Sequence, residues 1–173
     1  MALYGRSLLA AYATILEMTT SDQFADILPL ACQWVARQER MILHAGVPLL
    51  PAQLADAEDV GVQHPDRVRL LSVPAIPFPA DPLLHAAAQA THFLTPDTIG
   101  LTLRYGILLR TDYWGDRALL VHELVHSAQY ERLRGIEPFL RQYFSEVLAM
   151  GYARAPLEQE AIRMARMLTK HAD

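Results

Sequence analysis

Apolar side chains recur at intervals of three and four residues in several parts of this chain, which predicts amphipathic helices. The longest stripe covers residues 21–45, where Thr20 and Gln23 form a capping-box pattern at the start and Gly46 is a suitable stop. Further helices are predicted at residues 51–58, 82–93, 117–134, 138–150 and 156–171.

The middle of the chain has a different pattern. Residues 67–73 are short and rich in β-favouring side chains, and the prolines spread through residues 72–82 predict an extended surface segment. Residues 99–110 alternate apolar and other side chains throughout, which predicts a single strand. Thr102, Arg104 and Arg110 indicate that one face of this strand is partly solvated.

These strand signals lie between helical regions, so the sequence predicts an α+β fold that is mainly helical and has a small mixed or antiparallel sheet. The 173 residues fit a single domain. Its helical first part covers about residues 1–60, its strand-rich middle about 67–112, and its C-terminal helices about 116–171.

Charge and composition narrow the classes of partner. The longest stretches without a charged side chain, residues 41–55 and 82–96, are shorter than the roughly 20 residues of a spanning helix, so no membrane span is expected. The net charge is -4 and there is no basic run, so no nucleic-acid partner is expected. The apolar stretch near the N-terminus is short for a secretory signal. We therefore expect a cytoplasmic protein, with secretion as the alternative.

The candidate chemistry lies in the helix predicted after Asp116. His122 and His126 are one turn apart, so their Cβ atoms lie about 5–6 Å apart on one face and both imidazoles can reach one Zn²⁺. Glu123 lies one position along and can take a proton from a water on that metal, whose pKa falls from about 15.7 toward about 7. The alternative for these three residues is an exposed polar stripe.

The sequence of residues 122–130, His-Glu-Leu-Val-His-Ser-Ala-Gln-Tyr, together with residues 156–161, Pro-Leu-Glu-Gln-Glu-Ala, resembles the gluzincin branch of zinc metallopeptidases. The resemblance extends over residues 112–162. It implies a zincin-like fold, one zinc ion, peptidase activity and a glutamate on a second helix as the third zinc ligand. Ile162 stands where the family has an aspartate that supports a zinc-binding histidine, and Glu146, Asp112, Asp116 or a backbone carbonyl could take its place.

Two glutamates compete for the role of third ligand. Only residues three or four apart share a helix face, so Glu158 and Glu160 point in different directions. Glu158 shares a face with Ala161, Ile162 and Ala165, whereas Glu160 lies on a more polar side. An acid on an apolar face requires a partner such as a metal, so we favour Glu158 and keep Glu160 as the alternative.

Several tyrosines near these motifs are predicted to be core aromatics with a satisfied hydroxyl, Tyr130 and Tyr143 among them. Tyr152, just before the helix of Glu158, is the candidate for stabilising an oxyanion. His85 and His92 are predicted to form an exposed polar stripe rather than a second metal site.

The predicted function is a zinc-dependent metallopeptidase that acts on a peptide or protein, with Glu123 as general base and residues 99–110 as the edge strand that binds it. A catalytically inactive zincin-fold module for binding or assembly is the alternative, favoured by Ile162. Peptide deformylases share the histidine motif but use a cysteine ligand. Only Cys32 is available here, and it is predicted to be a buried thiol.

Overall fold

The computed structural model of this chain describes residues 21–91 and 93–170. Within these ranges it is an α+β fold that is mainly helical, as the sequence predicts. The helices are α2 (Ser21–Ala45), α3 (Pro51–Asp59), α4 (Pro82–Ala90), α5 (Arg117–Arg132), α6 (Ile136–Met150) and α7 (Pro156–Thr169). The strands are β1 (Val47–Pro48), β2 (Arg69–Val73), β3 (Gly100–Leu103) and β4 (Gly106–Arg110). Thr20 and His171, the predicted outer limits of two helices, lie outside the described residues.

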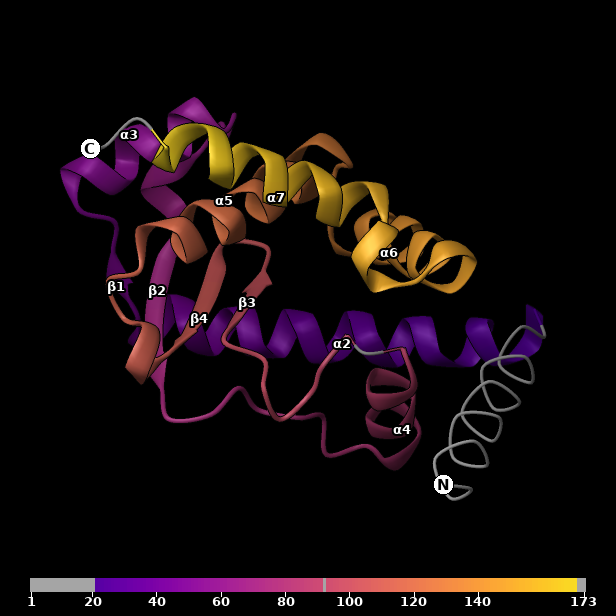
Figure 1. The fold of residues 1–173 in the computed structure, drawn as a ribbon. Helices are drawn as coiled ribbons and strands as arrows, with labels where there is room; N and C mark the ends of the chain where they lie inside the picture. Colours follow the sequence, from indigo (N-terminus) through magenta and orange to yellow (C-terminus); the bar gives the residue numbers. More distant parts are fainter. Residues whose placement is uncertain (1–20, 92, 171–173) are drawn as a thin grey trace, which may run out of the picture.

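The four strands form one mixed sheet in the order β1-β2-β4-β3. The central pair, β2 and β4, is parallel, and each outer strand pairs antiparallel with its neighbour. Figure 1 shows the long helix α2 on one side of this sheet and α5 and α7 on the other. The edge strand β3 contacts α5, which places one open sheet edge beside the helix that carries the histidine motif.

The prediction of one strand over residues 99–110 is wrong, because these residues form a β-hairpin. Leu103 pairs with Gly106 across a turn made of Arg104 and Tyr105, and Arg104 has a φ of 65°. The turn contains neither glycine nor asparagine, which most two-residue hairpin turns carry. Leu103 and Gly106 lie on the same face of the sheet, so odd-numbered residues before the turn face the same side as even-numbered residues after it.

The predicted partly solvated face is wrong for Thr102, since helices cover both faces of the hairpin, whereas Arg104 in the turn and Arg110 at the end of β4 are partly exposed. Leu101, Leu103 and Leu108 pack in the core that contains α2, whereas Ile107 and Leu109 pack in the core that contains α3 and α5. A strand buried on both faces is apolar at consecutive positions, as residues 107–109 are. Thr102, expected on the solvated face, is 5% exposed and faces α5.

The two helices that carry the candidate ligands are held at their ends. The Asp116 side chain accepts a hydrogen bond from Leu119 N and caps α5, as predicted. Helix α7 begins at Pro156, and the Glu146 carboxylate of α6 accepts a hydrogen bond from Leu157 N in its first turn. Caps of this kind satisfy amide groups that have no partner within the helix. Helices α5 and α7 pack against each other, so their facing side chains meet (Figure 1).

The proline-rich segment is irregular from residue 74 to residue 81, as expected, but it does not run entirely over the surface. Ile76 and Pro79 are buried against the α2 side of the molecule. Among the described residues, no helix combines the length and apolar character that crossing a membrane requires.

Candidate metal centre

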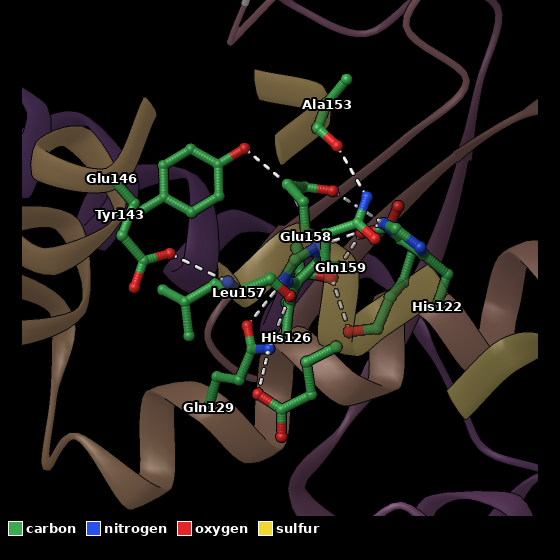
Figure 2. Close-up of polar contacts among 12 residues, drawn as sticks. His122, His126, Gln129, Tyr143, Glu146, Ala153, Leu157, Glu158 and Gln159 are labelled. Atoms are coloured by element: carbon green, nitrogen blue, oxygen red, sulfur yellow. Dashed lines mark hydrogen bonds and ion pairs between the residues drawn. The ribbon is translucent and has the colours of Figure 1, made fainter. Parts of the chain in front are cut away.

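Helices α5 and α7 bring three predicted ligands to one point. The Nε2 atoms of His122 and His126 lie 3.2 Å apart. Glu158 Oε2 is 3.4 Å from His122 Nε2, and Glu158 Oε1 is 3.5 Å from His126 Nε2. One donor atom from each residue therefore lies within 4.8 Å of the other two, an arrangement that could hold a metal ion (Figure 2).

Burial of Glu158 indicates what this arrangement is suited to hold. Its side chain is 2% exposed, and its Oε2 atom has no hydrogen-bond partner among the described residues. A buried carboxylate oxygen without a hydrogen bond is costly, because it has lost its hydration and no donor in hydrogen-bonding geometry replaces the water. This Oε2 atom lies 3.4 Å from His122 Nε2, and the other oxygen of the same carboxylate lies 3.5 Å from His126 Nε2, so a cation bound among the three side chains would satisfy it.

Electrostatics keep the Glu158 carboxylate ionised despite its burial. Burial alone would raise its pKa, but the contact with His122 at 3.4 Å, the electrostatic interaction with His126 and the hydrogen bond from Tyr143 lower the pKa to about 2. The pKa of His122 is raised in turn, since Glu158 and Glu123 outweigh the opposing effect of burial. The anionic carboxylate is the form that binds metals.

The Tyr143 hydroxyl donates a hydrogen bond of 2.6 Å to Glu158 Oε1. Tyr143 is buried, and burial followed by the charge of Glu158 raises its pKa well above the usual value, so the hydroxyl keeps its proton. The prediction that Tyr143 is a core aromatic residue with a hydrogen-bonded hydroxyl is therefore confirmed. The partner of that hydroxyl, a candidate ligand, was not expected.

Gln129 is the side chain that holds His126 by the ring nitrogen that faces away from Glu158. Its Oε1 atom lies 2.8 Å from His126 Nδ1, three residues along the same helix face. None of the predicted substitutes does this. Glu146 caps α7, Asp112 pairs with Arg110, and Asp116 caps α5.

Glu160, the alternative third ligand, points away from the histidines. Both of its carboxylate oxygens accept hydrogen bonds from Arg132, at 2.8 and 2.7 Å. Its Oε2 atom also accepts one from Gln129 Nε2 at 3.0 Å. Glu158 is therefore the acid that meets the histidines, as the helix-face argument predicts.

Glu123 lies on the side of α5 that faces the edge strand. It is 5% exposed, and its Oε2 atom accepts a hydrogen bond of 2.6 Å from the Thr102 hydroxyl. The other oxygen lies over Gly100, where an added Cβ would come within 2.5 Å of Glu123 Oε1. Strand β3 thus holds the carboxylate with a hydroxyl at one residue and makes room for it with a glycine at another.

An open cleft of about 670 Å³ contains these groups. One wall is the loop and edge strand of residues 97–102, and the others come from α5, α6 and α7. Both histidines, Glu123, Glu158 and Tyr152 line it. Tyr152 is 39% exposed, and partial desolvation in the cleft followed by the charges of Glu158 and Glu123 raises its pKa.

The other candidate residues lie apart from the cleft. Cys32 is half-buried on α2, near Glu137 and Arg141 of α6, and burial raises the pKa of its thiol. The His85 ring lies 3.2 Å from the carbonyl oxygen of Pro79, and His92 lies outside the described residues. Cys32 therefore does not join the histidines as a deformylase-like ligand.

Comparison with protein-family models, with curated proteins and with solved structures yields no match for this chain.

Proposed function

We propose that this chain is a zinc-dependent peptidase of the gluzincin type, with His122, His126 and Glu158 as the zinc ligands. The observation that carries the proposal is the buried Glu158 carboxylate, which faces two imidazole nitrogens in an open cleft and whose Oε2 atom has no hydrogen bond among the described residues. The next residue along the motif, Glu123, lines the same cleft, so a candidate base accompanies the candidate metal.

The donor set supports zinc in a catalytic rather than a structural site. Two imidazole nitrogens and one carboxylate oxygen suit Zn²⁺, and catalytic zinc sites combine three protein ligands with one open position. Structural sites instead use four protein ligands and are closed. A bound zinc ion would polarise the substrate carbonyl and lower the pKa of water toward about 7.

Glu123 is the proposed general base. It accepts a proton from the water that attacks the peptide carbonyl, and it then gives this proton to the leaving amine. A carbon–oxygen bond forms and the carbon–nitrogen bond breaks, so one water molecule is consumed for each peptide bond. Thr102 holds one carboxylate oxygen of Glu123, which leaves Oε1 to exchange the proton.

The edge strand is the proposed binding surface for an extended peptide. One side of β3 pairs with β4, and residues 99–102 of its other side line the cleft. Free main-chain N–H and C=O groups of an edge strand bind an added strand in register. Tyr152 lines the same cleft, keeps its hydroxyl proton and is the proposed donor to the oxyanion that develops on the carbonyl.

The test compares the wild-type protein with Glu123→Gln, both loaded with zinc, on a peptide library with product termini read by mass spectrometry. Glu123→Gln keeps the size of the side chain but cannot accept the proton. We expect it to retain zinc and to lose roughly 10²–10⁴-fold in turnover. Glu137→Gln, which changes an exposed acid on α6, is the matched control and should cleave like wild type.

Equal cleavage by wild type and Glu123→Gln would contradict the proposed mechanism. Absence of cleavage by zinc-loaded wild type would instead support the alternative function, an inactive zincin-fold module for binding or assembly.

A further inference from the structure

Gln129 is a fully buried polar side chain that connects the two ligand-bearing helices. It is 0% exposed, and each end of its amide has a partner. Its Nε2 atom donates hydrogen bonds to Leu157 O at 2.9 Å and to Glu160 Oε2 at 3.0 Å, both on α7. Its Oε1 atom lies 2.8 Å from His126 Nδ1 on α5. Figure 2 shows the Gln129 amide beside both His126 and Leu157.

The partners of Gln129 determine which way its amide points. A backbone carbonyl and a carboxylate only accept hydrogen bonds, so the amide –NH₂ group must face Leu157 and Glu160. The amide oxygen must then face His126. Arg132 fixes this orientation further, because it binds both oxygens of Glu160 and keeps that carboxylate anionic at the end of the chain of contacts.

The orientation of the amide in turn determines the proton position on His126. An amide oxygen only accepts, so the His126 Nδ1 atom beside it must carry the hydrogen. In the neutral ring the other nitrogen, Nε2, then has a free lone pair. Nε2 is the atom that lies 3.2 Å from His122 Nε2 and 3.5 Å from Glu158 Oε1.

We infer that Gln129 is a positioning residue that sets the tautomer of His126 for metal binding and ties that histidine to the helix of Glu158. The second effect follows from Leu157, because its carbonyl immediately precedes Glu158 and is held by the same amide that holds His126. Arg132 and Glu160 are the outer part of this arrangement. The inference rests on the proposed metal centre and assigns to Gln129 the task that an aspartate at position 162 has in gluzincins.

The first test needs no substitution. Nitrogen NMR of the metal-free wild-type protein, labelled in histidine and measured at alkaline pH where the imidazoles are neutral, reports which nitrogen of His126 carries the hydrogen. We expect the hydrogen on Nδ1, with a hydrogen bond to the Gln129 side chain. A hydrogen on Nε2 would overturn the inference.

The second test measures zinc affinity by competition with a chelator. Gln129→Met keeps the length of the side chain and removes both hydrogen-bonding groups, and Gln33→Met makes the same change at an exposed position of α2. Loss of an outer-shell partner typically costs 10–100-fold in metal affinity. We expect a loss of about that size for Gln129→Met, a mixed tautomer at His126, and no change for Gln33→Met. An unchanged affinity and tautomer in folded Gln129→Met would overturn the inference.

A third variant, Glu160→Gln, distinguishes Glu160 from the proposed ligands and leaves the buried Gln129 side chain unchanged. In Glu160→Gln the carbonyl of Leu157 still orients the Gln129 amide, so we expect the His126 tautomer to remain and zinc affinity to fall by less than about 10-fold. A loss of zinc equal to that of Glu158→Gln would overturn the assignment. If wild type shows hydrogen on Nδ1 yet binds no zinc, the inference about the tautomer holds and the proposed peptidase fails.

Discussion

The two faces of the β3–β4 hairpin use glycine for different purposes. On the α2 face, a Cβ added at Gly106 would lie 2.9 Å from Ile42 Cβ, so this glycine lets a helix pack closely on the strand. On the α5 face, a Cβ added at Gly100 would lie 2.5 Å from Glu123 Oε1, so this glycine makes room for an acid. One glycine therefore serves packing, and we propose that the other serves chemistry.

Buried acids extend the same comparison. Glu39 of α2 and Glu158 of α7 are both almost inaccessible to solvent. Glu39 accepts a hydrogen bond from Tyr105 N at the hairpin turn and lies 3.8 Å from the Arg104 guanidinium, so both of its contacts are structural. Glu158 has an oxygen without a hydrogen bond and faces two imidazoles. Burial alone therefore does not distinguish a candidate ligand from a structural acid, whereas the neighbouring groups do.

Removal of a proposed ligand should have the largest effect. We expect the zinc affinity of His126→Ala and Glu158→Gln to fall by more than the roughly 10–100-fold that is typical when an outer-shell partner is lost. Glu39→Gln makes the same change as Glu158→Gln at a buried acid of the α2 side, and it should retain one zinc per chain. Elemental analysis after dialysis measures the three contents, and equal zinc in Glu39→Gln and Glu158→Gln would contradict the assignment.

Substitution of Gly100 should affect turnover next. Gly100→Ala pushes the Glu123 carboxylate away from its position beside Thr102, and a displacement of about 1 Å at a catalytic group can cost roughly 10²-fold. Because the displaced atoms are the end of a flexible side chain, the free energy of unfolding should change little. Peptide cleavage and urea denaturation together measure the two effects. Unchanged cleavage would show that Glu123 does not depend on this space.

Substitution of Gly106 should show the opposite behaviour. Gly106→Ala places a methyl group against Ile42, and overpacking of this kind typically lowers the free energy of unfolding by about 1–3 kcal/mol. The folded fraction should bind zinc and cleave peptides like wild type, because the changed face is not the face of the cleft. If Gly106→Ala lost zinc without becoming less stable in urea, the proposed difference between the packing role of Gly106 and the chemical role of Gly100 would be wrong.

A smaller effect is expected from the titration of Glu39. Burial raises its pKa, and this outweighs the opposing effects of Tyr105 N and the nearby arginines. The folded state therefore binds this proton more tightly than the unfolded chain does. The free energy of unfolding should fall as pH rises from the ordinary glutamate value through the raised one. Glu39→Gln should reduce this dependence of the free energy of unfolding on pH, which urea titrations at several pH values measure. An unchanged dependence would show that other groups cause it.

Much of the helical part of the fold was predictable from the sequence, because proline and aspartate mark helix starts locally. Asp116 immediately precedes α5 and Pro156 is the first residue of α7, as the sequence predicts. The hairpin was not predictable from alternation. The alternation of apolar residues continues through the two-residue turn, although odd-numbered residues before the turn and odd-numbered residues after it point to opposite faces of the sheet. In addition, Arg104-Tyr105 is not a typical turn sequence. The consecutive apolar residues 107–109 were the available signal of a strand covered on both faces.

The candidate ligands were predictable because their spacing is set within single helices, whereas their supporting residues depend on how the helices pack. His122 and His126 share a face of α5 whatever surrounds it. Gln129 meets His126 on that same face, so its spacing was a usable signal, but its contact with Leu157 depends on the packing of α5 against α7. The hydrogen bond from Tyr143 to Glu158 likewise joins two helices.

The metal centre is tested most directly by anomalous scattering at the zinc edge from crystals grown with stoichiometric zinc. We predict one strong peak per chain, bonded to Nε2 of His122, Nε2 of His126 and a carboxylate oxygen of Glu158 at about 2.0–2.2 Å. No peak at these three residues, or a peak bonded to Glu160 in place of Glu158, would contradict the proposed centre.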